Sequence, residues 1–382
     1  MRIIHIVPLL SDDGSFGGPF RVALNQVREL RARGHEAEII TMRLGHSSAA
    51  RSFARESVRA FRGLRVPGLR FTGLISLELI LWLLRNRSVV DVLHVHASRD
   101  LVSMSAMAAS RFLPRARIIV QTHGMIQPSG RIGVRVFDSV LTTRLIVRSH
   151  VVLTLTNEER AGLQRLEPSI CTMSISNGLQ GSFEHAEEQR DHEVLFLARL
   201  QERKRPVQFV ETAAELHHRF PTWKWTIVGP DDGQLSRVKE AIEQKLLQDI
   251  VTYEGSLGYA EVERRLSRAS VYVLPSVDEP FPMSLLEAMQ AGLACVLTRS
   301  CGIAETLEKH QAALVADPNL PSIVRSVGRI LEDHELRMSL KREARRVVKS
   351  IYSIEAVVDR LLDIYGGSNG SSRDCIASEE AP

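Results

Sequence analysis

The 382-residue sequence predicts two doubly wound α/β domains, each a parallel sheet covered by helices on both faces. Two observations lead to this fold class. Short, continuously apolar segments alternate with helix-like segments, and this order stops at a polar, acidic stretch over residues 178–193 before it resumes. A chain of this length also has enough residues for two separate cores.

The first predicted domain comprises residues 1–180 and begins with an apolar strand, IIHIVPL, and an amphipathic helix over residues 19–33. Later strands are expected at AEIITM, VVDVLHVH, ARIIVQTHG, VVLTLT and ICTMSIS, with helices over residues 101–112, 131–148 and 158–166. The most apolar stretch, residues 71–84, is shorter than the ~20 residues of a membrane-spanning helix and contains Glu78. We therefore expect a buried helix there.

The second predicted domain, residues 193–350, follows a linker over residues 181–192. Its strands are expected at EVLFLARL, WKWTIVGP, IVTYEG, VYVLPS and LACVLT. We expect a helix over residues 351–366 to cross back to the first domain, and the polar tail over residues 367–382 to be disordered. Two such domains would face each other across a ligand cleft at the carboxyl ends of their strands.

Charge is divided unevenly along the chain. Residues 1–185 contain 24 arginines, no lysine and 14 acidic residues, whereas residues 186–382 carry a net charge of −6. The densest basic stretch runs from Arg51 to Arg70, where arginines are interleaved with apolar side chains. This composition is typical of a segment on an anionic membrane surface, and an arginine-rich solvated loop and helix is the alternative.

The four cysteines are few and scattered, with no CxxC pair. The apolar run at the N-terminus is too short for a signal peptide. We therefore expect a cytoplasmic protein, with peripheral association at the inner face of the membrane as a further prediction.

The stretch VDEPFPMSLLEAMQAG, residues 277–292, predicts an anion site. A helix that starts near Pro282 would leave the backbone N–H groups of Met283 and Ser284 free to bind an anion. Glu279 and Glu287 bracket these groups, which suits a ligand with phosphate and several hydroxyls, such as a nucleotide sugar. The alternative is a capped core helix with two solvated glutamates.

Further candidates follow predicted strands. Arg199 and Lys204 after EVLFL would neutralise a diphosphate, unless this is merely a basic turn. Gly17 and Gly18 precede the first helix and allow close approach to a phosphate, although a flexible turn is the alternative. His123 also lies at a strand end, where a lone histidine is either structural or catalytic.

A metal site is not expected from this sequence. The turn over residues 229–233 has adjacent acids rather than a DxD clamp, and HExxH, a cysteine–histidine cluster and a Walker loop are absent. We therefore expect no metal and no cofactor.

Taken in order along residues 1–365, these motifs resemble the retaining glycosyltransferase family four, whose members adopt the GT-B fold of two Rossmann-like domains. The most specific mark is the E-x7-E pair, Glu279 and Glu287. Further marks are Arg199-x4-Lys204, Gly17-Gly18, His123, Ser176-Asn177-Gly178 and the IVGPDDG turn. Pro282 stands where the family often has glycine, and Arg205 where it commonly has a small or polar residue; neither change removes a charge.

The resemblance implies a role for each candidate of the second domain. Arg199 and Lys204 would hold the diphosphate, Glu287 the ribose hydroxyls and Glu279 the donor sugar. Leu257 matches the stretch whose backbone reads the base.

It also implies that the backbone N–H groups of Gly18, Met283 and Ser284 assist at the phosphates, with Gly17 in the same loop as Gly18. His123 would lie beside the transferred sugar. The catalytic set would then be Glu279, His123, Arg199 and Lys204, without a metal.

The expected function is transfer of a sugar from a UDP- or GDP-linked donor to a saccharide or lipid-linked acceptor, with retention, in cell-surface polysaccharide or glycolipid synthesis. One alternative is a nucleotide-sugar epimerase or hydrolase of the same fold. Another is a basic protein that binds a membrane or nucleic acid. We expect no nucleic-acid partner, because aromatic residues are only 5% and no nucleic-acid-binding motif is present.

Overall fold

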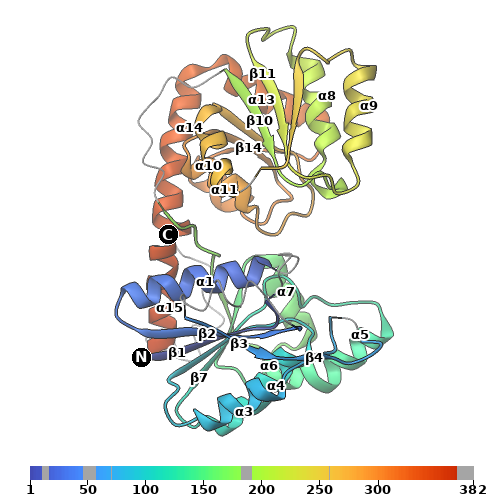
Figure 1. Cartoon of the computed structure of the whole chain (residues 1–382). Helices are drawn as coiled ribbons and strands as arrows, with labels where there is room; N and C mark the ends of the chain where they lie inside the picture. Colours follow the sequence, from blue (N-terminus) through green and yellow to red (C-terminus); the bar gives the residue numbers. More distant parts are fainter. Residues whose placement is uncertain (11–16, 46–56, 70, 182–191, 258, 368–382) are drawn as a thin grey trace. The chain divides into compact units, whose positions relative to one another are not determined.

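The computed structural model describes residues 1–10, 17–45, 57–69, 71–181, 192–257 and 259–367 (Figure 1). The chain divides into two compact units. Unit 1 is Met1–Gly178 together with the chain from Ile354 onward, and unit 2 is Leu179–Ser353. Each unit is built on its own parallel sheet, which confirms the predicted fold class.

Unit 1 contains a seven-stranded sheet in the order β3-β2-β1-β6-β7-β8-β9, and every neighbouring pair is parallel. The order reverses between β1 and β6, which makes their carboxyl ends the switch point of a doubly wound sheet. The strands are β1 (Arg2–Val7), β2 (Glu36–Arg43), β3 (Val58–Arg62), β6 (Val92–His96), β7 (Arg117–Gln121), β8 (Val151–Thr154) and β9 (Thr172–Ser174).

Two layers of helices bury the two faces of this sheet. Alternate strand residues point to opposite faces, so Ile4 and Ile6 join one apolar cluster and Ile3 and Val7 the other. Figure 1 shows α15 beside α1 on the second face. The helices are α1 (Gly17–Ala32), α3 (Leu77–Arg85), α4 (Leu101–Ala109), α5 (Ile132–Phe137), α6 (Thr143–Ile146), α7 (Asn157–Leu166) and α15 (Ile354–Gly366).

The buried helix expected over residues 71–84 is wrong in two respects. A short hairpin of β4 (Leu64–Arg65) and β5 (Leu74–Ile75) precedes α3, which begins only at Leu77 with Ser76 as its N-cap. One side of α3 is exposed, with Leu77 at 68% and Leu81 at 51% exposure. Its apolar sequence therefore does not reflect burial on all sides.

Unit 2 contains a six-stranded sheet in the order β12-β11-β10-β13-β14-β15, again with parallel neighbours. The strands are β10 (Glu193–Leu197), β11 (Lys224–Val228), β12 (Val251–Gly255), β13 (Val271–Leu274), β14 (Ala294–Thr298) and β15 (Leu314–Ala316). The helices are α8 (Pro206–Leu216), α9 (Leu235–Gln244), α10 (Tyr259–Arg268), α11 (Met283–Gln290), α12 (Ala304–Lys309), α13 (Leu320–Glu332) and α14 (His334–Val347). The switch point lies between β10 and β13.

Several predictions lie outside the described residues. They are the linker over residues 182–191, the tail from residue 368 and most of the basic stretch from Arg51 to Arg70. None of the described helices is both long and apolar enough to cross a lipid bilayer. Cys295 and Cys301 are buried free thiols, whereas Cys171 is disulfide-bonded, which the scattered spacing did not predict.

Candidate functional site

The switch point of unit 2 brings two of the predicted residues into direct contact. Lys204 ends the short helix Glu202–Lys204 that follows β10, and Glu279 lies in the loop that follows β13. The Lys204 ammonium donates a hydrogen bond to Glu279 Oε2, and both side chains are buried. The ion pair therefore ties together two loops that come from adjacent parallel strands.

A second cation belongs to the same group. Arg203 Nη2 lies 3.6 Å from Glu279 Oε2, and Arg203 Nη1 donates to the carbonyl of Asp278 at 3.0 Å. The backbone joins the loops as well, since Val277 N–H donates to the Arg203 carbonyl at 2.9 Å. Two cations thus face one carboxylate, which leaves positive charge available for an anionic ligand.

Arg199 is more open than Lys204. Its side chain is 60% exposed and lies 3.3 Å from Asp232, in the turn after β11. That turn passes so close to the end of β10 that a Cβ on Gly229 would meet the Ala198 carbonyl oxygen at 1.9 Å. The neighbouring Asp231 carboxylate accepts hydrogen bonds from the N–H groups of Leu235, Gly233 and Gln234, and these bonds lower its pKa.

The predicted anion-binding helix is α11, and it begins one residue later than expected. Pro282 is its N-cap rather than its first residue, with ψ at 86°. No hydrogen bond from the Met283 or Ser284 N–H group occurs within the part of the chain that the structure describes. Gly292 has φ at +80°, the left-handed residue predicted beyond the helix end.

Tyr272 was missed by the sequence analysis. It is fully buried in β13, and its hydroxyl donates to the Leu197 carbonyl at 2.9 Å and lies 2.8 Å from Ser284 Oγ. It therefore joins the end of β10 to the first turn of α11. Burial raises its pKa, and the charges of Glu287 and Glu279 add to this effect. The one sequence feature that pointed to Tyr272 was its polar hydroxyl in a strand of otherwise apolar residues.

Two further candidates of unit 2 belong to other elements, and β12 lies two strands away from β10 in the sheet. Glu287 is in α11 and partly exposed. Leu257 follows β12 after Gly255, whose φ of +82° turns the chain away from the strand.

In unit 1, Gly17 and Gly18 begin α1. Gly18 lines a cavity of about 200 Å³ with Val7, Ser98 and Met125, at the carboxyl ends of β1 and β6. A Cβ on Gly18 would meet no atom of the described residues within 4 Å, so these residues leave the backbone of α1 accessible at this point.

His123 lies just beyond β7 and is not the lone histidine that the sequence analysis assumed. Its φ is +51°, and its Nε2 lies 2.8 Å from Nδ1 of His96. His96 in turn contacts His5 at 3.0 Å. Burial lowers the pKa of His123 and of His5 to about 3, so both rings are neutral at pH 7.

Among the described residues, three buried histidines form the group that most resembles a metal-binding site. The ring nitrogens of His5, His94 and His96 lie within 4.8 Å of one another. Both ring nitrogens of His5 and of His96 already take part in hydrogen bonds, so neither ring has a nitrogen free to coordinate a metal ion.

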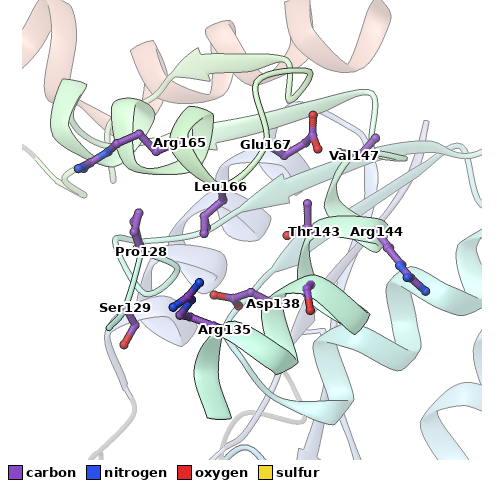
Figure 2. Close-up of a pocket in the computed structure, with 11 residues that line it drawn as sticks. Pro128, Ser129, Arg135, Asp138, Thr143, Arg144, Val147, Arg165, Leu166 and Glu167 are labelled. Carbon is purple, nitrogen blue, oxygen red and sulfur yellow. The ribbon is translucent and has the colours of Figure 1, made fainter. Parts of the chain in front are cut away.

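A larger pocket of about 660 Å³ lies elsewhere in unit 1, between α5, α6 and the end of α7 (Figure 2). Its lining includes Arg135, Arg144 and Arg165, but Figure 2 shows Arg144 and Arg165 extending away from each other. Asp138 there is bonded to Arg99 at 2.7 Å. None of the predicted site residues lines this pocket.

Comparison with known proteins gives two family matches. The model described as "Glycosyl transferases group 1" matches residues 180–347, and "Glycosyltransferase Family 4" matches residues 16–179. The chain is similar to 2-deoxystreptamine N-acetyl-D-glucosaminyltransferase of Niallia circulans, 26% identical over 313 residues that cover 76% of this chain and 80% of the relative.

A second relative is the GDP-mannose:cellobiosyl-diphosphopolyprenol alpha-mannosyltransferase of Xanthomonas campestris, 22% identical with 98% of both chains covered. Among solved structures, Anabaena Alr3699/HepE in complex with UDP has a TM-score of 0.74 at 15% identity, covering 96% of this chain and all of that one. The G117R mutant of S. aureus TarM in complex with Fondaparinux, alpha-GlcNAc-glycerol and UDP has a TM-score of 0.70 at 12% identity, covering 95% of this chain and 99% of that one. These structures share the fold.

Proposed function

The chain belongs to the family 4 glycosyltransferases, and on that premise we propose that unit 2 binds a nucleotide diphosphate sugar at the switch point between β10 and β13. The observation that carries this proposal is the cluster of Lys204, Arg203 and Glu279, with Arg199 following the same strand. The α11 N–H groups of Met283 and Ser284 supply further donors for phosphate.

Each residue has a proposed role in the donor complex. Arg199 and Lys204 contact the diphosphate, Glu279 the sugar and Glu287 the ribose hydroxyls. Leu257 contacts the base through its backbone.

The proposed roles in unit 1 are contact of His123 with the transferred sugar and of the Gly18 N–H group with phosphate. Gly17 keeps the start of α1 open for this approach. These roles follow the family resemblance and the positions of both residues after parallel strands.

The chemistry follows from charge. Transfer breaks the bond between the anomeric carbon and the phosphate oxygen, which leaves a diphosphate anion and an oxocarbenium-like sugar. A fixed donor at a developing anion contributes about 3–4 kcal/mol to the transition state in comparable sites. Lys204 is already held in place by Glu279, so it need not be ordered when the donor binds.

We propose retention of the anomeric configuration, with the leaving phosphate oxygen accepting the proton of the acceptor hydroxyl. No metal has a role in this scheme, because Arg199, Lys204 and the α11 N–H groups neutralise the leaving group. The donor base is uracil or guanine, as in the UDP complex and the GDP-mannose enzyme named above.

The proposed acceptor is a saccharide or a lipid-linked sugar, in cell-surface polysaccharide or glycolipid synthesis, as the diphosphopolyprenol in one relative's name supports. We propose a cytoplasmic location and docking on anionic lipid through Arg51 to Arg70. Arg59 has its own contacts, 3.5 Å from Glu38 and stacked on Trp82. Vesicle co-sedimentation that does not depend on anionic lipid would remove the membrane proposal.

The test of the proposed function is a transfer assay by NMR after a thermal-shift screen has selected the donor. A stabilising ligand at 100 times its dissociation constant should add about 2.7 kcal/mol. Glycosyl transfer requires acceptor, whereas conversion of donor without acceptor would favour an epimerase or hydrolase. Full activity of a folded Lys204→Ala variant would refute the site assignment; Arg219→Ala, which breaks an exposed ion pair with Glu332 in the same unit, is the matched control.

A further inference from the structure

We propose that His96, His5 and Tyr365 are positioning residues that fix the protonation tautomer of His123 through one continuous chain of hydrogen bonds, which we call the histidine relay. The catalytic consequence of this inference rests on the proposed role of His123. The hydrogen-bond geometry of the relay is independent of that role.

The relay runs from a strand end into the interior of unit 1. His123 Nε2 lies 2.8 Å from His96 Nδ1, and His96 Nε2 lies 3.0 Å from His5 Nδ1. His5 Nε2 lies 3.5 Å from the Tyr365 hydroxyl, which contacts His94 Nδ1 at 2.6 Å.

Local structure explains why these rings meet. His5 in β1 is directly opposite His94 in β6, and His96 is two residues further along, so all three side chains point to one face of the sheet. The helix α15 covers that face and contributes Tyr365. The rings of His96 and His123 are stacked at 5.0 Å with 14° between their planes.

The rings of the relay are neutral. Burial lowers the pKa values of His5, His94, His96 and His123, and the other histidines lower those of His94 and His96 further. The groups that face these rings are one another, Tyr365, Gln121 and Asn177; no carboxylate acts on them among the described residues.

A neutral imidazole has one N–H and one bare nitrogen, and this constrains the whole chain. Every link between two rings joins an Nε2 to an Nδ1, and Tyr365 makes the same connection from His5 Nε2 to His94 Nδ1 through its hydroxyl. Each link therefore needs a donor on one side and an acceptor on the other. All four histidines must share one tautomer, either Nε2–H or Nδ1–H.

The functional consequence lies at His123. With Nε2 engaged by His96, the other nitrogen, Nδ1, has a fixed role as donor or acceptor toward its partner, which is Asn177 in this structure and a sugar hydroxyl in the proposed donor complex. The tautomer of His123 is thus set by side chains that do not touch the ligand, one of them in the C-terminal helix.

The direct test is long-range proton–nitrogen NMR of the full chain labelled with ¹⁵N-histidine. Four rings with one common tautomer that does not titrate between pH 7.5 and pH 6, where unit 1 stays folded, are expected. Tyr365→Phe should alter the ring signals of His123 although the two side chains are not in contact, and Tyr352→Phe, a buried tyrosine of unit 2, should not. Mixed tautomers in the wild type, unaltered His123 signals in Tyr365→Phe, or tight binding of one Zn²⁺ to these rings would overturn the relay.

Kinetics supply a matched pair of variants. In His96→Asn the side-chain amide takes the place of Nδ1, so His123 keeps its partner. In His96→Gln the amide takes the place of Nε2, so only the link to His5 is kept. We expect kcat to fall by about 10- to 100-fold in His96→Gln alone, with the donor KM unchanged. Equal losses in both variants would overturn the positioning role. Full activity of His123→Ala would instead refute the proposed role of His123, and the NMR result would still decide the relay.

Discussion

Acid should destabilise unit 1 selectively, because three of its histidines are buried without a counter-charge. His5, His94 and His96 are fully buried, and burial lowers their pKa values, that of His5 to about 3. In the unfolded chain each returns to about 6.5. The unfolded state therefore binds more protons below that pH, so stability present above it is lost as pH falls toward the folded pKa.

The size of the effect can be worked out for a change from pH 7 to pH 5. The two histidines whose pKa is lowered to about 3, His5 and His123, should each lose about 2 kcal/mol of folding free energy, or about 4 kcal/mol together, and His94 and His96 act in the same direction. Asp100 acts in the opposite direction, because burial raises its carboxyl pKa to about 6 and the folded state then takes up its proton first. It offsets about 1 kcal/mol, which leaves a loss of about 3 kcal/mol before His94 and His96 are counted, a large part of the stability of many domains.

The assay is urea unfolding at pH 7 and at pH 5, followed through 5-fluorotryptophan incorporated in place of tryptophan. Trp82 reports on unit 1, and Trp223 and Trp225 report on unit 2 of the same molecule. None of the described histidines of unit 2 is buried, so unit 2 is the internal control. Equal pH dependence of the two units, or none in unit 1, would refute the reasoning.

Three substitutions in unit 2 test a buried ion pair of its core and two supports of the candidate site. Arg265→Met should cost about 3–5 kcal/mol of stability by urea unfolding, because it leaves the buried carboxylate of Glu193 without its partner at 2.9 Å; an unchanged midpoint would contradict this. Tyr272→Phe should cost about 1 kcal/mol and weaken nucleotide binding in calorimetry, since the hydroxyl joins β10 to α11, and unaltered binding would separate it from the site. Gly229→Ala should displace the end of β10 and weaken binding more than Gly233→Ala, which shares the positive φ but whose Cβ would meet no described atom within 4 Å; equal affinities would argue against the close approach.

The sequence predicted the two parallel sheets because their signal is local. Continuous apolar strands and intervening helices are visible without knowledge of strand pairing. The helix expected over residues 71–84 failed for the same reason, since composition does not tell which side of α3 faces solvent.

The candidate site was predicted in part. The strand-end positions of Arg199 and Lys204 and the left-handed Gly292 could be predicted from spacing and turn chemistry. The pairing of Lys204 with Glu279 could not, because it depends on β10 lying beside β13.

The histidine relay was missed for a related reason. His94 and His96 look like polar residues in an apolar strand until β1 places His5 opposite them. Contacts between residues far apart in sequence depend on sheet order and register, which the pattern of a single chain does not contain.

The central claim is that the Lys204–Glu279 pair belongs to a diphosphate site, and calorimetric binding of UDP and GDP tests it most directly. Lys204→Met should weaken binding of the preferred nucleotide by at least about tenfold, because a charged hydrogen bond to phosphate is lost. Glu279→Gln should bind it at least as tightly as the wild type, because the amide oxygen can still accept the Lys204 hydrogen bond while the negative charge that opposes a phosphate is removed. Unchanged affinity in a folded Lys204→Met variant, or equal weakening in both variants, would contradict the account.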